Sequence, residues 1–123
     1  MSLHSALLAY DGSPKAEEAL FVATYLAGRW GIPLTVLTVA QRGHTSAATL
    51  RHAERYLADH GVSATLVQER GPVVEAILHT ARERRSGLLI MGGYGHRPVL
   101  EVVLGSTVEE VLRTACCPML ICR

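Results

Sequence analysis

Apolar positions along the chain change repeatedly between short continuous runs and stretches with helical spacing. The runs predict strands at residues 5–10, 34–39, 62–67, 88–91 and 118–122. Apolar residues spaced three and four apart predict helices over residues 14–30, 46–60, 72–84 and 106–115. Strands that alternate with helices are typical of an α/β fold with a parallel sheet, because right-handed crossovers place successive strands side by side with helices on both faces.

Local signals mark the ends of the first predicted helix. Ser13 is a natural N-cap and Pro14 a natural first helical residue, whereas Gly31 and Pro33 stop the helix. The helix at 46–60 has a thinner apolar face, which consists of Leu50, Ala53 and Leu57.

Composition narrows the class of protein. The chain has 123 residues, of which 49% are hydrophobic and 19% charged, as expected for one globular domain over residues 1–123. The formal net charge is +1. This balance lacks the basic excess that would hold nucleic acid or an anionic membrane, so any anionic ligand must be held by local geometry.

The cysteine pattern and the length of the apolar runs indicate the cellular compartment. Cys116, Cys117 and Cys122 are odd in number and crowded near the end of the sequence, which fits neither a disulfide framework nor a C-x-x-C metal or redox pair. No apolar run approaches the ~20 residues that a membrane span needs. We therefore expect a cytoplasmic protein without a membrane partner.

Two unusual segments follow predicted strands. They are Asp11-Gly12-Ser13 after the first strand and Gly92-Gly93-Tyr94-Gly95 after the fourth. Ligands in open α/β sheets collect at the carboxyl ends of the strands, where the strand order reverses. These segments are therefore the candidates for a binding site.

The glycines after the fourth strand are part of a longer pattern. Gly92 and Gly95 are followed, nine residues later, by Gly105-Ser106 at the start of a predicted helix. Backbone N–H groups in a glycine turn and at a helix start can cradle a polyphosphate without lysine. The alternative is a simple flexible turn, with Ser106 and Glu109 forming a capping box for their own helix.

Asp11 also has two interpretations. A carboxylate at the end of a first strand can accept hydrogen bonds from ribose hydroxyls or from an adenine amine. It can equally satisfy backbone N–H groups at the turn into the helix. The chain has neither G-x-G-x-x-G nor G-x-x-x-x-G-K-[ST], so a nicotinamide enzyme and a P-loop NTPase are disfavoured.

Taken together, these motifs resemble the universal stress protein family. The resemblance rests on Gly92-x2-Gly95-x9-Gly105-Ser106, on the apolar strand before it, on the segment from Cys117 to Ile121, and on the opening from Leu8 to Ser13. It implies a five-stranded parallel sheet of order 3-2-1-4-5 that binds ATP, ADP or AMP, with Mg²⁺ on the phosphates.

The resemblance also implies where the nucleotide lies. Ala9, Tyr10 and Asp11 would border adenine and ribose, and Val39 and Met91 would line the base pocket, although both also suit plain core packing. Ribose and phosphates would be surrounded by Gly92, Gly95, Gly105, Ser106 and Thr107. Of the scattered histidines only His96 lies beside the proposed phosphate loop, so His96 and Arg97 are either phosphate contacts or solvated loop residues.

The sequence departs from the family in places that bear on binding. ATP-binding members often have Pro-Val before the first aspartate, where this chain has Ala9-Tyr10. Tyr10 can narrow the base pocket or stack on the base. The connection from Gln41 to Ser46 looks shorter than usual, which would leave the nucleotide more exposed.

Three functions remain open at this point. The first is a nucleotide-dependent regulatory or interaction module with an unidentified protein partner and at most slow ATP hydrolysis, because no base for water or dedicated metal carboxylates are visible. The second is a nucleotide-free dimerisation module. The third is a flavodoxin-like electron carrier, which the scarcity of aromatics disfavours. The resemblance further implies a homodimer through the edge strand from Pro118 to Cys122.

Overall fold

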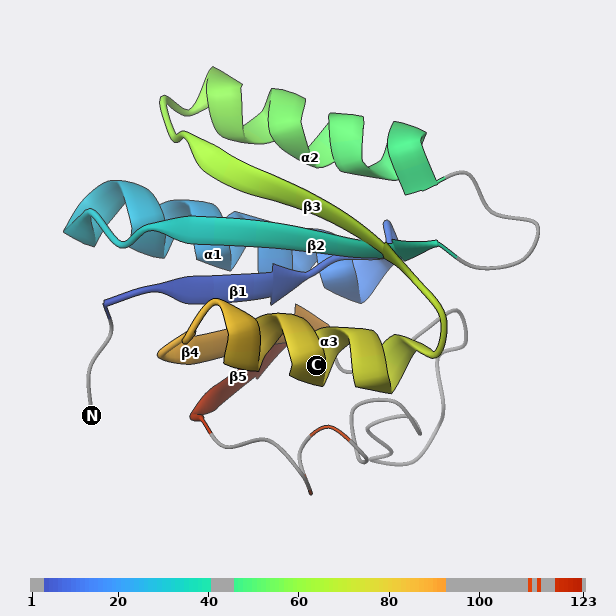
Figure 1. Cartoon of the computed structure of the whole chain (residues 1–123). Coiled ribbons are helices and arrows are strands. Elements are labelled where there is room, and N and C mark those ends of the chain that lie inside the picture. Colours follow the sequence, from blue (N-terminus) through green and yellow to red (C-terminus); the bar gives the residue numbers. More distant parts are fainter. Residues whose placement is uncertain (1–3, 41–45, 93–110, 112, 114–116, 123) are drawn as a thin grey trace, which may run out of the picture.

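The computed structural model describes residues 4–40, 46–92, 111, 113 and 117–122. Its strands are β1 (Ala6–Ala9), β2 (Leu34–Ala40), β3 (Ala64–Arg70), β4 (Leu88–Gly92) and β5 (Met119–Cys122), and its helices are α1 (Pro14–Trp30), α2 (Ser46–Asp59) and α3 (Val73–Glu83). The strands form one sheet of order β3-β2-β1-β4-β5 in which every pair is parallel, as Figure 1 shows. The predicted α/β fold and strand order are confirmed.

One predicted strand is displaced along the sequence. The third strand was expected at residues 62–67, but β3 is Ala64–Arg70, paired in register with Leu34–Ala40 of β2. Val62 instead belongs to the turn after α2, where its N–H donates to the carbonyl of Leu57 at 2.9 Å. Of the helix predicted at residues 106–115, only Val111 and Arg113 are described, and both are helical.

The ends of α1 follow the signals in the sequence. The Ser13 side chain accepts a hydrogen bond from the Ala16 N–H at 3.3 Å, and Pro14 occupies the first turn, where its missing N–H costs nothing. Gly31 ends the helix with φ of 64°, a left-handed conformation that glycine adopts without strain.

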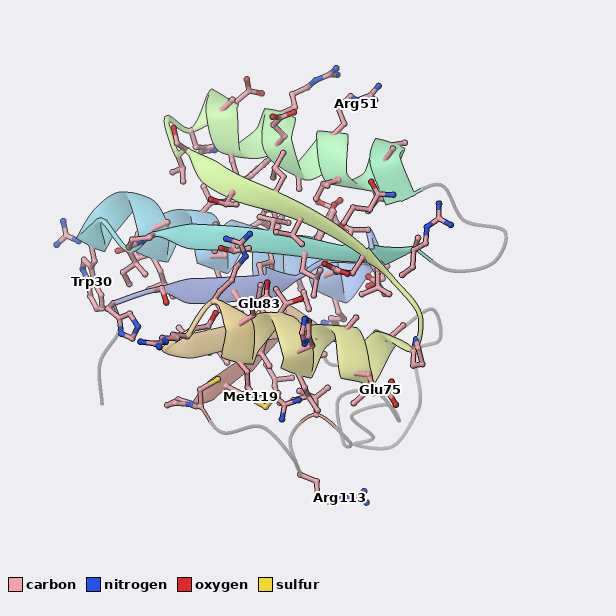
Figure 2. The ribbon with its side chains drawn as sticks, viewed as in Figure 1. Trp30, Arg51, Glu75, Glu83, Arg113 and Met119 are labelled. Carbon is pink, nitrogen blue, oxygen red and sulfur yellow. The ribbon has the colours of Figure 1, made fainter. Side chains whose placement is uncertain are left out.

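Two hydrophobic clusters lie on opposite faces of the sheet. Because side chains alternate along a strand, Ala6, Leu8 and Tyr10 join one cluster with α1 and α2, whereas Leu7 and Ala9 join the other with α3. In Figure 1, α3 lies in front of the sheet and α1 behind it. The outward surfaces of α2 and α3 carry charged side chains such as Arg51, Glu75 and Glu83 (Figure 2).

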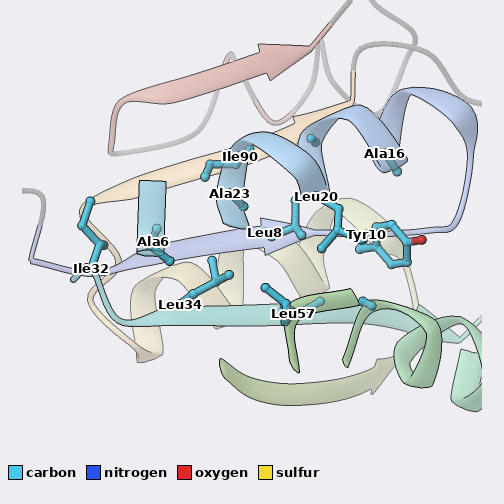
Figure 3. Packing of buried hydrophobic residues seen from close by; sticks show 14 residues of the cluster. Ala6, Leu8, Tyr10, Ala16, Leu20, Ala23, Ile32, Leu34, Leu57 and Ile90 are labelled. Atoms are coloured by element: carbon cyan, nitrogen blue, oxygen red, sulfur yellow. The ribbon is translucent and has the colours of Figure 1, made fainter. Parts of the chain in front are cut away.

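The α1 face is packed largely by small residues. Ala16, Ala19 and Ala23 are at most 2% exposed, so α1 approaches the sheet closely along its first turns (Figure 3). Helix α2 is held by less apolar surface, since Ala53 and Leu57 are its only fully buried side chains among those described. No helix in the described ranges is long and apolar enough to cross a membrane.

Candidate functional site

The carboxyl ends of β1 and β4 form the centre of the candidate site. Ala9 is in register with Leu37 of β2 on one side and with Met91 of β4 on the other. The chain leaves β1 toward α1 on one face of the sheet, whereas the helix that precedes β4 lies on the other face. The predicted ligand-binding edge is therefore the point where the strand order diverges.

Three of the predicted base-pocket residues lie together. Ala9, Val39 and Met91 all belong to the cluster on the α3 face, at the carboxyl ends of three adjacent strands. Met91 is buried at 5% exposure, whereas Ala9 and Val39 are half-buried. Together they form an apolar border at this edge of the sheet, as an adenine ring would require.

Tyr10 points to the opposite face. Its side chain is 2% exposed in the α1 cluster, and its hydroxyl donates a hydrogen bond to Glu17 Oε1 (Figure 3 shows the ring and its hydroxyl). Burial is the main reason that the pKa of this phenol is raised well above its usual value, and the hydrogen bond and the negative charge of Glu17 add to the effect. Only the backbone of Tyr10 is left to border a ligand beside Ala9.

Asp11 begins the turn into α1. It is exposed, and its Oδ1 accepts a hydrogen bond from the Ser13 N–H at 2.9 Å. Gly12 between them has φ of 81°, which favours glycine. Asp11 thus organises the helix start, and because an ionised carboxylate has two oxygens and several acceptor positions, it can also accept ribose hydroxyls.

Gly92 ends β4 in close contact with the start of α1. A Cβ atom built on Gly92 would lie 2.6 Å from the carbonyl carbon of Lys15 and 2.7 Å from the Ala16 nitrogen. Close packing against α1 is therefore one reason for a glycine at this position, independent of any contact with a ligand. The remaining predicted residues, namely Gly95, His96, Arg97, Gly105, Ser106 and Thr107, lie outside the described residues.

Two polar residues near the site were not singled out from the sequence. Thr38 is buried, and its Oγ1 donates to the Tyr10 carbonyl at 3.1 Å, which ties β2 to the end of β1. Glu17 accepts from Tyr10 and lies 3.0 Å from His52 Nε2 on α2. Neither residue belongs to a motif, and only the packing of β1, α1 and α2 reveals their roles.

Cys122 is a free, half-buried cysteine at the end of β5. Burial and the Glu18 carboxylate raise the pKa of the Cys122 thiol, while Lys15 acts in the opposite direction. A raised pKa keeps this sulfur protonated and weakly nucleophilic. Across the described ranges, His, Cys, Asp and Glu side chains form no group of three that can hold a metal ion.

Comparisons with known proteins all lead to one family. The sequence profile of the universal stress protein family matches residues 40–123. A universal stress protein of Synechocystis sp. is 32% identical, and the match covers 97% of this chain and 42% of that protein. Universal stress protein YxiE of Bacillus subtilis is 28% identical over 95% of this chain and 97% of its own length.

A solved structure agrees with the sequence comparisons. The crystal structure of a universal stress protein from Archaeoglobus fulgidus superposes with a TM-score of 0.82 at 30% identity, over 98% of this chain and 44% of that chain. The chain thus spans less than half the length of the Synechocystis and Archaeoglobus proteins, and nearly all of the Bacillus protein.

Proposed function

The chain belongs to the universal stress protein family, and we propose that it binds ATP or a related adenine nucleotide at the carboxyl ends of β1 and β4. The observation that carries the proposal is the juxtaposition at this edge. The apolar border of Ala9, Val39 and Met91 suits an adenine ring, and the Asp11 carboxylate beside it suits ribose hydroxyls.

Fold neighbours support the ligand class. One solved universal stress protein is a complex with cAMP, at a TM-score of 0.82 and 24% identity. Another, from Archaeoglobus fulgidus, is a complex with dAMP, at a TM-score of 0.77 and 21% identity. Both ligands are adenine nucleotides, which is the class that the sequence motif and the apolar border favour here.

The phosphates would be bound by the sequence motif from Gly92 to Thr107. Its backbone N–H groups and hydroxyls would supply donors, with His96 and Arg97 as cationic contacts and Mg²⁺ bound to the phosphate oxygens. In this proposal, nucleotide occupancy regulates contact with a protein partner in the cytoplasm, and ATP hydrolysis is slow at most.

A homodimer through β5 is part of the same proposal. Strand β5 pairs with β4 on one side, and it is the last strand in the order of the sheet. All four of its residues are half-buried. Antiparallel pairing of two copies would satisfy the hydrogen-bonding groups of this edge. Light scattering at micromolar concentration tests it, and a monomer would refute it.

Thermal unfolding with and without Mg-ATP tests nucleotide binding. Ligand at ~100 times its dissociation constant adds about 2.7 kcal/mol to the free energy of unfolding, or roughly 10 °C for a domain of this size. The variant that combines Gly105→Val with Ser106→Val is the control, and it should unfold at the same temperature with and without nucleotide.

The opposite outcome favours the second candidate function. If wild-type protein carries no nucleotide after purification and shows no shift with Mg-ATP, the nucleotide-free dimerisation module becomes the better interpretation. Burial of the Tyr10 side chain on the other face removes the main sequence-based reason to expect that outcome.

A further inference from the structure

A chain of polar contacts connects the end of β1 to the surface of α2. Glu17 Oε1 accepts a hydrogen bond from the Tyr10 hydroxyl, and the same oxygen lies 3.0 Å from His52 Nε2. Tyr10 is buried, Glu17 is partly exposed, and the His52 side chain is 60% exposed. One carboxylate oxygen therefore joins a buried phenol to a histidine in contact with water.

The buried end of this chain is next to the candidate site. Tyr10 lies between Ala9 and Asp11, and its N–H donates to the Leu37 carbonyl at 2.9 Å. The α2 end also reaches the β1–α1 turn, because a Cβ atom built on Gly12 would be 3.4 Å from Thr49 Cγ2, one turn of α2 before His52. Helix α2 thus lies close to the turn at Gly12 and pairs with Glu17 in the first turns of α1.

We infer that Glu17 is a positioning residue that ties Tyr10 to His52, so that protonation of His52 strengthens nucleotide binding at the end of β1. The inference rests on the proposed function, because it concerns the regulation of the same site. A protonated imidazole donates from Nε2 and adds a positive charge, whereas a neutral imidazole donates from Nε2 in only one tautomer. Protonation therefore favours the arrangement in which Glu17 holds both neighbours.

Several charged groups lie near this pair. At the end of β1, the Tyr10 hydroxyl donates to Glu17, and Asp11 is close enough to Tyr10 to help raise its pKa. On α1, Lys15 pairs with Glu18 at 2.9 Å. On α2, the charged neighbours of His52 in sequence are Arg51, Glu54 and Arg55, and all three are exposed. Because the pair is itself partly exposed, the coupling should be modest, about two- to fivefold in affinity.

Calorimetric titration with Mg-ATP at about pH 6 and about pH 8 tests the inference, because histidine is the side chain type whose charge changes most readily in this range. The measured quantity is the ratio of the two dissociation constants, compared among variants so that protonation of ATP itself cancels. His52→Gln keeps a donor that does not titrate, and Tyr10→Phe removes only the hydroxyl. His79→Gln is the matched control, because His79 pairs with Glu83 at 2.8 Å within α3, and both side chains are exposed.

We expect the wild type and His79→Gln to bind more tightly at the lower pH, by the same factor. The preference is the dissociation constant at pH 8 divided by that at pH 6. In both His52→Gln and Tyr10→Phe, this ratio should be about two- to fivefold smaller than in the wild type. A His52→Gln protein with the wild-type ratio would overturn the inference. A smaller ratio in His52→Gln but not in Tyr10→Phe would also overturn it, because His52 would then act without Tyr10. Absence of binding at both pH values would instead overturn the proposed function, and the inference with it.

Discussion

Replacement of Gly92 by alanine should destabilise the protein through the contact between β4 and α1. The new Cβ would lie 2.6 Å from the Lys15 carbonyl carbon and 2.9 Å from its oxygen. These are backbone atoms of a capped helix, so no side chain can rotate away. The end of β4 and the first turn of α1 must separate by about 0.8 Å before the shortest contact reaches 3.4 Å, an ordinary van der Waals distance.

This separation has a cost beyond the clash itself. Ala16, Ala19 and Leu20 pack α1 onto the sheet with at most 2% exposure. A gap of 0.5–1 Å removes about a quarter to a half of the dispersion energy of each contact that it opens. Overpacking of this kind costs about 1–3 kcal/mol, which corresponds to roughly 4–12 °C in melting temperature for a domain of this size.

Urea denaturation followed by circular dichroism measures the change in the free energy of unfolding. Gly28→Ala is the matched control, because it adds the same methyl group on α1, the helix that Gly92 contacts. Its Cβ would lie 3.4 Å from Val62 Cγ2, and alanine in a helix is favoured over glycine by about 1 kcal/mol. The control should therefore be at least as stable as the wild type. A Gly92→Ala protein as stable as Gly28→Ala would refute the close approach of β4 and α1.

Three further predictions concern other parts of the molecule. Leu57→Ala should cost about 2–5 kcal/mol in urea denaturation, because Leu57 is the largest fully buried side chain among those described on α2; a loss below 1 kcal/mol would contradict the packing of α2 described above. The raised pKa of Tyr10 means that its stabilising contribution is fully present below about pH 10 and is lost as the pH rises above that value. Wild-type protein should therefore lose stability faster than Tyr10→Phe between about pH 9 and 11, and parallel losses would argue against burial of this phenol. Trp30 is 61% exposed at the end of α1, so Trp30→Ala should change stability by less than about 0.5 kcal/mol, and the native protein's tryptophan fluorescence should be quenched by acrylamide almost as well as that of the unfolded chain.

Much of the fold could be predicted because its signals are local. The Ser13 cap, Pro14 and the Gly31 stop lie within a few residues of the helix ends that they define, and α1 begins and ends where they predict. The start of β3 was harder to predict from the sequence. Its start depends on the register with β2, a partner strand some thirty residues earlier, and an apolar residue such as Val62 suits a turn against the core as well as a strand.

The candidate site could also be predicted only in part. The sequence places Ala9 and Asp11 near the end of the first strand and Met91 at the end of the fourth strand, and the pairing of β1 with β4 brings these two strand ends together. The orientation of Tyr10 could not be settled from the sequence, since it depends on which face of β1 α1 covers. The role of Glu17 also depends on three elements that meet only in the folded chain.

The amino-acid sequence alone determined the order and type of the elements, the parallel α/β architecture and the position of the glycine motif after the fourth strand, because these follow from periodicity and from turn chemistry between near neighbours. The tertiary structure decided which face each side chain occupies, why a side chain at Gly92 would meet the backbone of α1, and how Glu17 joins Tyr10 to His52. These features depend on distances between backbone segments far apart in the sequence, and such distances are fixed only when the sheet and its helices pack together.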